Sequence, residues 1–341
     1  MKILIVGNYK YKFYAKAIFD AFKKTDNDVK SFKLDEFNYK GSNKILQLFD
    51  IFQSKFIVGP KISKINKLIL KKIKDQNYDL VFLYRAVEIN HLTVYNIKKL
   101  GCKVFSYNND DPFSEIPSKN YWNNYIKSAK FCDHNFVYRF KNVIDFENIG
   151  INNVSILKSY YLKEVNYPKI LNKNLDVIFI GHYENDGRDI YIKALLDAKI
   201  NIKVFGGDLW KQAPLYEQIK HIIKKPVYGK QYNFIINKSK IALVFLSKIN
   251  SDTYTRRCFE ITSAKTLMMS EYTDELNAMF EENKEAIYFN SKEELVNKCR
   301  MLLLNPNLIK KISDSGYKRL LKDGHSSDNR VTEILNKFIN K

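Results

Sequence analysis

The sequence predicts an α/β fold built from two doubly wound domains, each a parallel sheet covered by helices, followed by C-terminal helices. Short apolar runs alternate with segments of helical periodicity along most of the 341 residues. The pattern restarts after a polar stretch at Lys173-Asn174, which we interpret as a linker. We therefore expect an N-terminal domain over 1–170, a C-terminal domain over 171–325, and a terminal helix over 326–341 that could cross back to the first domain.

Short apolar runs are the candidates for buried strands, because a parallel sheet covered on both faces is apolar throughout. In the first half they are Ile3–Val6, Leu80–Tyr84, Val104–Tyr107, Phe136–Tyr138 and Val154–Leu157. In the second half they are Val177–Ile180, Ile202–Phe205, Ile241–Phe245, Thr266–Met269 and Ile287–Phe289. The clearest helices are Ile62–Ile73, Glu293–Leu303, Leu308–Lys322 and Val331–Ile339. The stretch Asn38–Pro60 is too irregular to assign.

The composition favours a basic, reduced, cytoplasmic protein. A formal net charge of +20 attracts polyanions, which include nucleic acid, anionic lipid and phosphorylated small molecules, and charge alone does not choose among them. The four cysteines have no C-x-x-C spacing, so neither a zinc site nor a disulfide framework is expected. No run approaches the roughly 18 apolar residues of a membrane span. Action at a membrane would therefore take place on its surface.

In doubly wound folds, ligands bind beyond the carboxyl ends of the strands, so those loops are the candidate sites. The loop from Gly181 to Arg188 includes His182 and ends at a predicted helix start. A cation is mildly unfavourable at a helix N-terminus unless an anion binds nearby, so Arg188 suggests a phosphate site. An ordinary turn with a solvated arginine is the alternative.

A second loop of the same half repeats this feature. Arg256 and Arg257 stand where a helix is predicted to begin, after a loop that contains Asp252. Glu260 lies eight positions after Asp252, within the first turns of that helix. The arginines could hold phosphates and the carboxylates could hold hydroxyl groups of one ligand. The alternatives are a surface arginine pair and a carboxylate that stabilises a helix N-terminus.

Three further elements occupy the same kind of position. Gly206-Gly207 permits a tight turn or the close approach of a ligand, and Tyr228 could pack on a nucleobase; plain turns are the alternative for both. In the first half, Asp110 and Asp111 follow a strand and could supply a general base, or could form turn and capping contacts before Pro112. Nothing else in the sequence completes a metal site with them.

Several familiar catalytic motifs do not occur. The sequence contains no G-x-S-x-G element, no P-loop and no G-x-G-x-x-G fingerprint. Serine hydrolase, P-loop ATPase and classical dinucleotide dehydrogenase activities are therefore not expected.

A set of spaced features extends from Arg257 to Leu335. They are Arg257-x-Phe259-Glu260, Leu267, Leu276, Phe280-Glu281, Glu285, Glu293-Glu294-Leu295, Leu302–Pro306, Ile312 with Gly316, and His325 followed by Arg330. Upstream, Phe179-Ile180-Gly181 with Arg188, Phe205-Gly206-Gly207 with Trp210, and Asp110-Asp111-Pro112 fit the same pattern. Together these features resemble the spore-maturation (CgeB-like) glycosyltransferases.

The resemblance implies a GT-B fold, in which two Rossmann-like domains face each other across a cleft and the second binds a nucleotide sugar. It also implies a relationship to the retaining group with a Glu-x7-Glu pattern. Glu260 would then hold the donor ribose, and Asp252, one methylene shorter than the usual Glu, would contact the transferred sugar. Arg188 and Arg257 would hold the diphosphate. Lys265 departs from the glycine that the family often has at this position.

These inferences together predict a hexosyltransferase that uses a UDP-, GDP- or dTDP-linked sugar and neither a metal nor another cofactor. The expected donor-site residues are Gly181, His182, Arg188, Gly206, Gly207, Tyr228, Arg256, Arg257 and Glu260. The expected catalytic residues are Glu260, Asp252, Arg257, Asp110 and Asp111.

The expected acceptor is a glycan, a lipid-linked sugar or another precursor of cell-surface polysaccharide, and transfer is expected to retain configuration. Peripheral association with an anionic membrane at its cytoplasmic face is expected, and nucleic acid is not an expected partner. A nucleotide-sugar epimerase of the same fold is the alternative enzyme, and a non-catalytic nucleic-acid-binding protein is the alternative outside enzymes.

Overall fold

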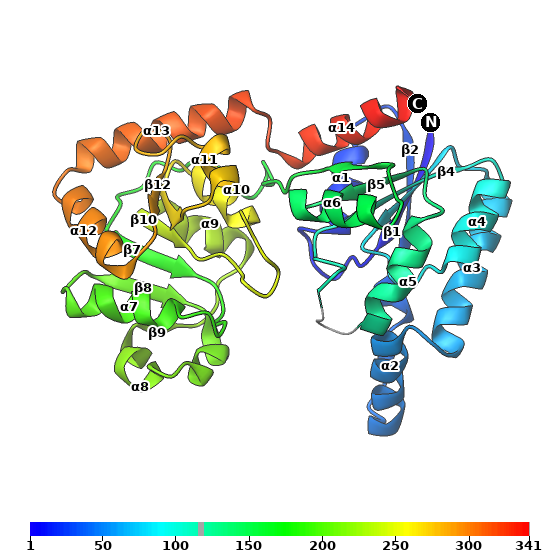
Figure 1. Ribbon diagram of the computed structural model, residues 1–341, viewed down its shortest axis with the longest axis horizontal. Coiled ribbons are helices and arrows are strands. Elements are labelled where there is room, and N and C mark those ends of the chain that lie inside the picture. Colours follow the sequence, from blue (N-terminus) through cyan, green and yellow to red (C-terminus); the bar gives the residue numbers. More distant parts are fainter. Residues whose placement is uncertain (115–118, 341) are drawn as a thin grey trace. The chain divides into compact units, whose positions relative to one another are not determined.

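The computed structural model describes residues 1–114 and 119–340, which form two compact units. Unit 1 comprises Met1–Lys158 together with the C-terminal segment from Ser327, and unit 2 comprises Ser159–Ser326. Figure 1 shows a parallel sheet with helices around it in each unit.

The sheet of unit 1 has six parallel strands in the order β2-β1-β3-β4-β5-β6. Its strands are β1 (Lys2–Gly7), β2 (Asp28–Lys33), β3 (Leu80–Tyr84), β4 (Lys103–Asn108), β5 (His134–Val137) and β6 (Val154–Ile156). Its helices are α1 (Ala15–Phe22), the 3-10 helix η1 (Leu34–Phe37), α2 (Lys44–Phe56), α3 (Pro60–Gln76), α4 (His91–Lys99), α5 (Lys119–Ala129), α6 (Phe140–Asn148) and α14 (Ser327–Ile339).

The sheet of unit 2 is also parallel and six-stranded, in the order β12-β11-β10-β7-β8-β9. Its strands are β7 (Leu175–Ile180), β8 (Ile202–Phe205), β9 (Ile223–Lys224), β10 (Ser239–Val244), β11 (Leu267–Glu271) and β12 (Ile287–Phe289). Its helices are α7 (Arg188–Asp197), η2 (Gly207–Gln212), α8 (Tyr216–Ile219), η3 (Lys220–Ile222), α9 (Gly229–Asn237), α10 (Arg256–Ser263), α11 (Asp274–Met279), α12 (Lys292–Leu303) and α13 (Pro306–Lys322).

The apolar runs of the sequence form the two cores. Ile3–Val6 of β1 is fully buried, and every residue of β3 is buried as well. In α3, the side chains of Ile62, Ile65, Ile69 and Ile73 cover the sheet, as their helical spacing predicts. Because helices occupy both faces, the edge formed by the carboxyl ends of the strands is where ligands are expected to bind.

The elements that the sequence did not reveal have weak local patterns. In β2, an edge strand, only Val29 and Phe32 are buried, so the run lacks the continuous apolar character of its neighbours. The strand β9 is two residues long. The unassigned stretch Asn38–Pro60 contains α2, whose apolar residues do not enter the core.

The division between the units differs from the expected boundary at residue 170. Residues 159–170 belong to unit 2, where Tyr161 pairs with Ser326 in a parallel bridge. The carbonyl of Tyr167 accepts hydrogen bonds from the amides of Asn233 and Asn237, each at 3.1 Å. These contacts attach the segment to unit 2. The terminal helix α14 is part of unit 1, where it packs on α1.

The described residues include no helix that is both long enough and apolar enough to cross a bilayer.

Candidate functional site

The N-terminus of α10 places Arg257 at the carboxyl edge of the unit 2 sheet. Arg257 is the second residue of α10, and the side chain of the N-cap residue Thr255 makes no capping hydrogen bond. Nη1 of Arg257 donates to the carbonyl of Ile180, at the end of β7, at 3.2 Å. Its Nε is buried and has no hydrogen-bond partner within the described part of the chain. The guanidinium therefore lies beside a helix N-terminus, a place where an anion is favourably bound.

Gly181 gives the guanidinium of Arg257 its space. A Cβ on residue 181 would lie 2.6 Å from Nη1 of Arg257 and 2.7 Å from the ring of Phe179. Any larger residue would have to displace one of these groups. The structure thus brings together two predicted site residues that are far apart in the sequence.

A buried carboxylate follows Arg257 on the same helix. The Glu260 side chain is only 8% exposed, and its Oε1 lies 2.8 Å from Nε of Arg256. Burial raises the pKa of Tyr232, on α9, well above its ordinary value, and the neighbouring Glu260 carboxylate raises it further. Arg256 and Glu260 are thus paired with each other. Tyr232 is a neighbour of this pair that sequence patterns did not indicate.

Arg188 makes contacts within its own loop that the sequence did not suggest. Its side chain is 1% exposed, and its Nε and Nη2 donate to the two carboxylate oxygens of Asp186 at 2.8 and 2.5 Å. Its Nη1 donates to the carbonyl of His182 at 2.8 Å, and Nη2 lies 3.5 Å from Glu184. The acidic residues of its own loop therefore enclose the guanidinium. This geometry fits a clamp that fixes the loop between Gly181 and Arg188 more closely than a direct phosphate ligand.

Glu184 links this clamp to the next loop. Burial by itself raises its pKa, but hydrogen bonds from His182 and Ser247, together with the charge of Arg188, lower the pKa to about 2. His182 Nε2 lies 3.2 Å from Glu184, and the His182 side chain is 55% exposed. His182 is thus exposed in this loop, and its Nε2 is already paired with Glu184.

The loop before α10 is held by backbone and side-chain contacts. The amide of Asp252 donates to the carbonyl of Ser247 at 2.9 Å. Thr253 donates through Oγ1 to Glu275 at 2.5 Å, and its carbonyl accepts from Thr273 at 2.6 Å. Asp252 is near the first turn of α10, where its charge adds to the effect of burial in raising the pKa of Cys258 to about 11.

The two glycines after β8 serve close packing. Trp210 donates through Nε1 to the carbonyl of Gly181 at 2.9 Å, and a Cβ on Gly206 would clash with both of these groups. Gly207 has a φ of +71°, which favours glycine. These residues therefore support the Gly181 loop. Tyr228, which precedes α9, is 73% exposed and is free to receive a flat ring.

Lys265, where the resemblance noted in the sequence implied a glycine, has a φ of +52°. Its Nζ lies 3.6 Å from Asp314 and 4.8 Å from the ring centroid of Tyr317, both on α13. Its charge is therefore directed toward α13. The left-handed backbone explains why glycine suits this position.

Unit 1 holds the other predicted carboxylates. Oδ2 of Asp110 lies 2.5 Å from Nη2 of Arg85, and its side chain is 22% exposed. Arg85 follows β3 with a φ of +46°, and it lies beside Tyr121. Burial is the main cause that raises the pKa of Tyr121 to about 12. Arg85 and Tyr121 are site candidates that carried no recognisable motif in the sequence.

Asp111 is a structural residue in this geometry. Its side chain is 4% exposed, and Oδ1 accepts from the amide of Phe113 at 2.9 Å and from Asn142 at 2.8 Å. Its Oδ2 lies 3.2 Å from Nζ of Lys141. Turn and capping chemistry, one of the two interpretations of the sequence, accounts for these contacts. Asp110 is the more accessible of the two candidate bases.

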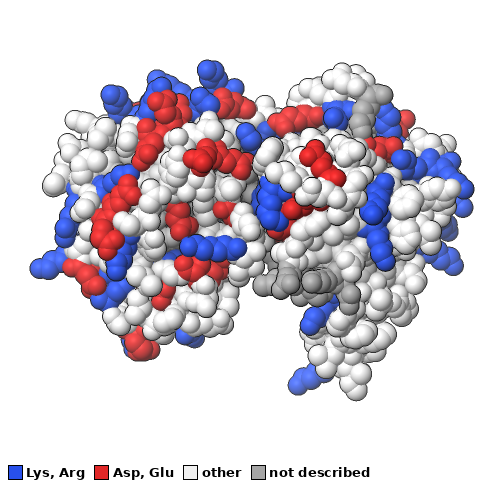
Figure 2. Space-filling model, viewed as in Figure 1, with Lys and Arg blue, Asp and Glu red and all other residues white. Residues whose placement is uncertain are grey.

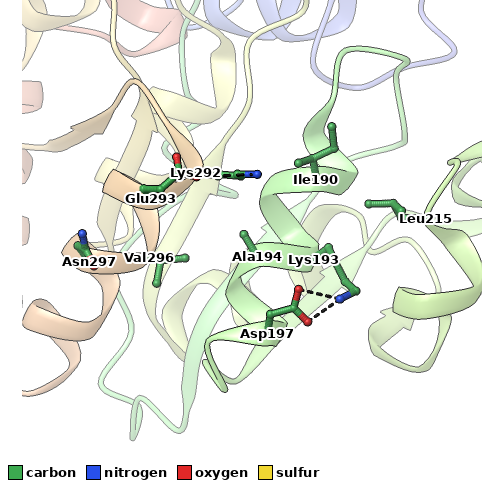
Figure 3. A pocket seen from close by; sticks show the side chains of 9 residues that line it. All are labelled: Ile190, Lys193, Ala194, Asp197, Leu215, Lys292, Glu293, Val296 and Asn297. Atoms are coloured by element: carbon green, nitrogen blue, oxygen red, sulfur yellow. Dashed lines mark hydrogen bonds and ion pairs between the residues drawn. The ribbon is translucent and has the colours of Figure 1, made fainter.

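One surface pocket of unit 2 lies apart from these residues. It has a volume of about 360 Å³ and lies between α7 and α12 (Figure 3). Ile190, Ala194, Leu215 and Val296 supply apolar lining, and Lys193 pairs with Asp197 at its rim. None of the predicted site residues lines it. Among the residues described, no group of three or more His, Cys, Asp or Glu side chains is arranged to hold a metal ion.

The architecture matches known enzymes over its whole length. A structure of HepE from Anabaena in complex with UDP and glucose has a TM-score of 0.72 at 11% identity, and all of each chain is covered. Sucrose-phosphate synthase from Thermosynechococcus elongatus has a TM-score of 0.69 at 9% identity, with 100% of this chain and 98% of that chain covered. The fold is GT-B. At these identities the likeness shows the fold and leaves the activity open.

Sequence similarity points to the same class of protein. Residues 188–336 match the family model described as Glycosyl transferase-like. Alpha-monoglucosyldiacylglycerol synthase of Acholeplasma laidlawii is 26% identical over 233 residues, which cover 65% of this chain and 52% of that protein. The chain thus spans about half the length of this relative. The region matched by the family model, residues 188–336, includes Arg256, Arg257 and Glu260.

Proposed function

We propose that the protein is a glycosyltransferase that binds a nucleoside diphosphate sugar at the carboxyl edge of the unit 2 sheet. The observation that carries this proposal is the position of Arg257. Its guanidinium stands at the N-terminus of α10 and is anchored by the carbonyl of Ile180. A match to a glycosyltransferase-like family model over 188–336 supports the same assignment.

The chemical task of this site is to stabilise the negative charge of the leaving diphosphate. As the bond between the anomeric carbon and the phosphate oxygen breaks, charge builds on that oxygen. A fixed guanidinium and the N–H groups of α10 stabilise this charge without reorganising, because both are already in place. Arg257 therefore acts on the leaving group, and the proposed reaction needs no metal.

The remaining residues orient the donor. The Glu260 carboxylate holds the ribose hydroxyls, with Arg256 and Tyr232 fixing its position. Asp252 contacts the transferred sugar, and the exposed ring of Tyr228 packs on the nucleobase. Arg188 acts as a positioning residue that holds the Gly181 loop.

Transfer proceeds with retention in this proposal. The acceptor hydroxyl oxygen bonds to the anomeric carbon on the face that the phosphate leaves, and the hydroxyl proton passes to the departing phosphate oxygen. No side chain then has to serve as a base. If transfer inverts configuration, Asp110 is the candidate base, because its carboxylate is more accessible than that of Asp111.

The proposed acceptor is a glycan or a lipid-linked sugar bound by unit 1. The name of the Acholeplasma laidlawii relative indicates a glucosylated diacylglycerol, which supports an acceptor of lipid character. The basic composition of the chain favours an acceptor that is anionic or displayed on an anionic surface.

Product analysis with UDP-, GDP- and dTDP-sugars tests this function directly. Each donor is incubated with a membrane-lipid extract or a glycan acceptor, and the reaction is followed by nucleotide release and mass spectrometry. Transfer predicts release of nucleoside diphosphate together with an acceptor heavier by one sugar. An altered sugar with free nucleotide, formed without any acceptor, would instead identify an epimerase. Salt-sensitive binding of polynucleotides with no response to any nucleotide sugar would contradict both enzyme assignments.

A further inference from the structure

Helix α2 turns its apolar face away from the protein. Ordinary surface helices bury the apolar face and expose the polar one. Six large apolar side chains of α2 are instead between 47% and 76% exposed, and they are Ile45, Leu46, Leu48, Phe49, Ile51 and Phe52. Gln53 is the buried residue of this helix. Figure 1 shows α2 projecting from the body of unit 1.

The inverted orientation is built by specific polar contacts. Nζ of Lys61 lies 3.0 Å from Oδ1 of Asp50, with side-chain exposures of 7% and 18%. The same Nζ donates to Oγ of Ser54 at 2.8 Å, and the amide of Lys61 donates to Oε1 of Gln53 at 2.8 Å. These bonds fix the polar face of α2 against the start of α3.

The ends of α2 are also defined. Oδ1 of Asn43 accepts hydrogen bonds from the amides of Ile45 at 2.9 Å and Leu46 at 3.3 Å, which caps the N-terminus. Ile57 closes the C-terminus in a left-handed conformation. The apolar face is thus presented by a well-formed helix.

The surroundings of this helix are strongly basic. Residues 40–74 contain nine lysines against one aspartate, a net charge of +8. The single acidic residue, Asp50, is already paired with Lys61. The region of α2 in Figure 2 is mostly uncharged, with lysines beside it. An exposed apolar strip bordered by lysines fits a surface that is apolar below and anionic at its boundary.

We propose that α2 is a membrane-binding helix that lies in the interface of an anionic bilayer. Its apolar side chains enter the acyl boundary, and the lysines of α2 and α3 other than Lys61 bind lipid phosphates. A second copy of the chain is the less suitable partner, because pairing would bring two segments of +8 together. The inference adds to the proposed function a surface that would bring the enzyme to a lipid-carried acceptor.

Vesicle binding tests this inference without any sugar donor. Cosedimentation of the full chain is measured with phosphatidylcholine vesicles, with and without 30 mol% phosphatidylglycerol, at low and high salt. The test variant is Phe49→Ser/Phe52→Ser, which removes two exposed rings and no core contact. The control is Met301→Ser/Leu304→Ser, at exposed positions of α12 and its C-cap that are 43% and 82% accessible.

The wild type and the control are expected to bind anionic vesicles, with binding weakened by salt and by omission of phosphatidylglycerol. The α2 variant is expected to bind at least about tenfold more weakly, because it lacks two of the apolar side chains that would enter the acyl boundary. Equal binding of the α2 variant and the wild type would overturn the proposal. The proposal would also be overturned if the α2 variant bound vesicles normally but changed from dimer to monomer in light scattering, because α2 would then be a contact between two copies of the chain. Vesicle binding does not depend on the donor site, so Arg257→Ala is expected to bind vesicles like the wild type. Failure of the transferase assignment would therefore leave the result of this test unchanged.

Discussion

Gly181 and Arg257 fit together so closely that a Cβ at residue 181 would lie 2.6 Å from Nη1 of the arginine. This relationship connects the loop after β7 with the start of α10. Gly181→Ala should therefore displace the guanidinium and lower kcat/KM for sugar transfer by about tenfold to a hundredfold. The measurement is steady-state kinetics of nucleotide release, with far-UV circular dichroism to confirm folding.

A double-mutant cycle shows whether Gly181 acts through Arg257. In the Arg257→Ala background, Gly181→Ala should have little further effect on kcat/KM, because the displaced group is already absent. Additive losses in the double variant would show that Gly181 affects transfer by another route.

Arg257 itself should have the largest effect of the unit 2 arginines on catalysis. Arg257→Ala is expected to reduce kcat for transfer by roughly 100-fold or more, as the loss of one preorganised donor to a developing anion does in other enzymes. Arg300→Ala, on α12, is the matched control, because Arg300 makes one long contact of 3.4 Å to the carbonyl of Ala198. Wild-type turnover from Arg257→Ala would remove Arg257 from the mechanism.

Arg188 should affect stability more than chemistry. Arg188→Met leaves the carboxylate of Asp186 buried without its partner, which should cost about 3–5 kcal/mol of unfolding free energy. Adding Asp186→Asn should recover part of this loss. Chemical denaturation of the wild type and these two variants provides the measurement. An Arg188→Met protein as stable as the wild type but unable to bind nucleotide would instead assign Arg188 to the ligand.

Glu184 should make the folding stability of the protein depend on pH in the acidic range. Its folded pKa of about 2 is below the ordinary value of 4.5, so the ionised form stabilises the folded state above pH 4.5. This contribution is lost as the pH falls from 4.5 toward 2. The difference in urea midpoint between the wild type and Glu184→Gln should therefore narrow as the pH falls from 4.5 to 3.5. A constant difference down to pH 3.5 would disprove the assigned pKa.

The sequence predicted the sheets well because their strands are continuous apolar runs. Ile3–Val6 and Leu80–Tyr84 became inner strands of the unit 1 sheet, and Val177–Ile180 an inner strand of the unit 2 sheet. The edge strand β2 was missed, because only Val29 and Phe32 among its six residues are apolar and buried. Helix α2 could not be placed for a related reason, since its apolar residues serve the surface.

The site was predicted less completely, because side-chain pairing depends on distant residues. The sequence indicated Arg257 and Gly181 as site residues but could not show their contact. It also suggested that Arg188 binds phosphate, whereas Asp186 and Glu184 enclose its guanidinium. The two acidic residues that precede Arg188 by two and four positions were the only sign in the sequence that its guanidinium would be paired within the loop. Arg85 and Tyr232 carried no such signal.

Nucleotide binding by unit 2 is tested most directly by isothermal titration calorimetry of the full chain. UDP, GDP and dTDP are titrated into the wild type, Arg257→Ala and the Arg300→Ala control. At least one diphosphate should bind the wild type and the control, and its affinity should fall at least about tenfold in Arg257→Ala, because a charge-assisted contact to the diphosphate is lost. Equal affinity for that nucleotide in the wild type and Arg257→Ala, or no binding of any of the three to the wild type, would contradict the account.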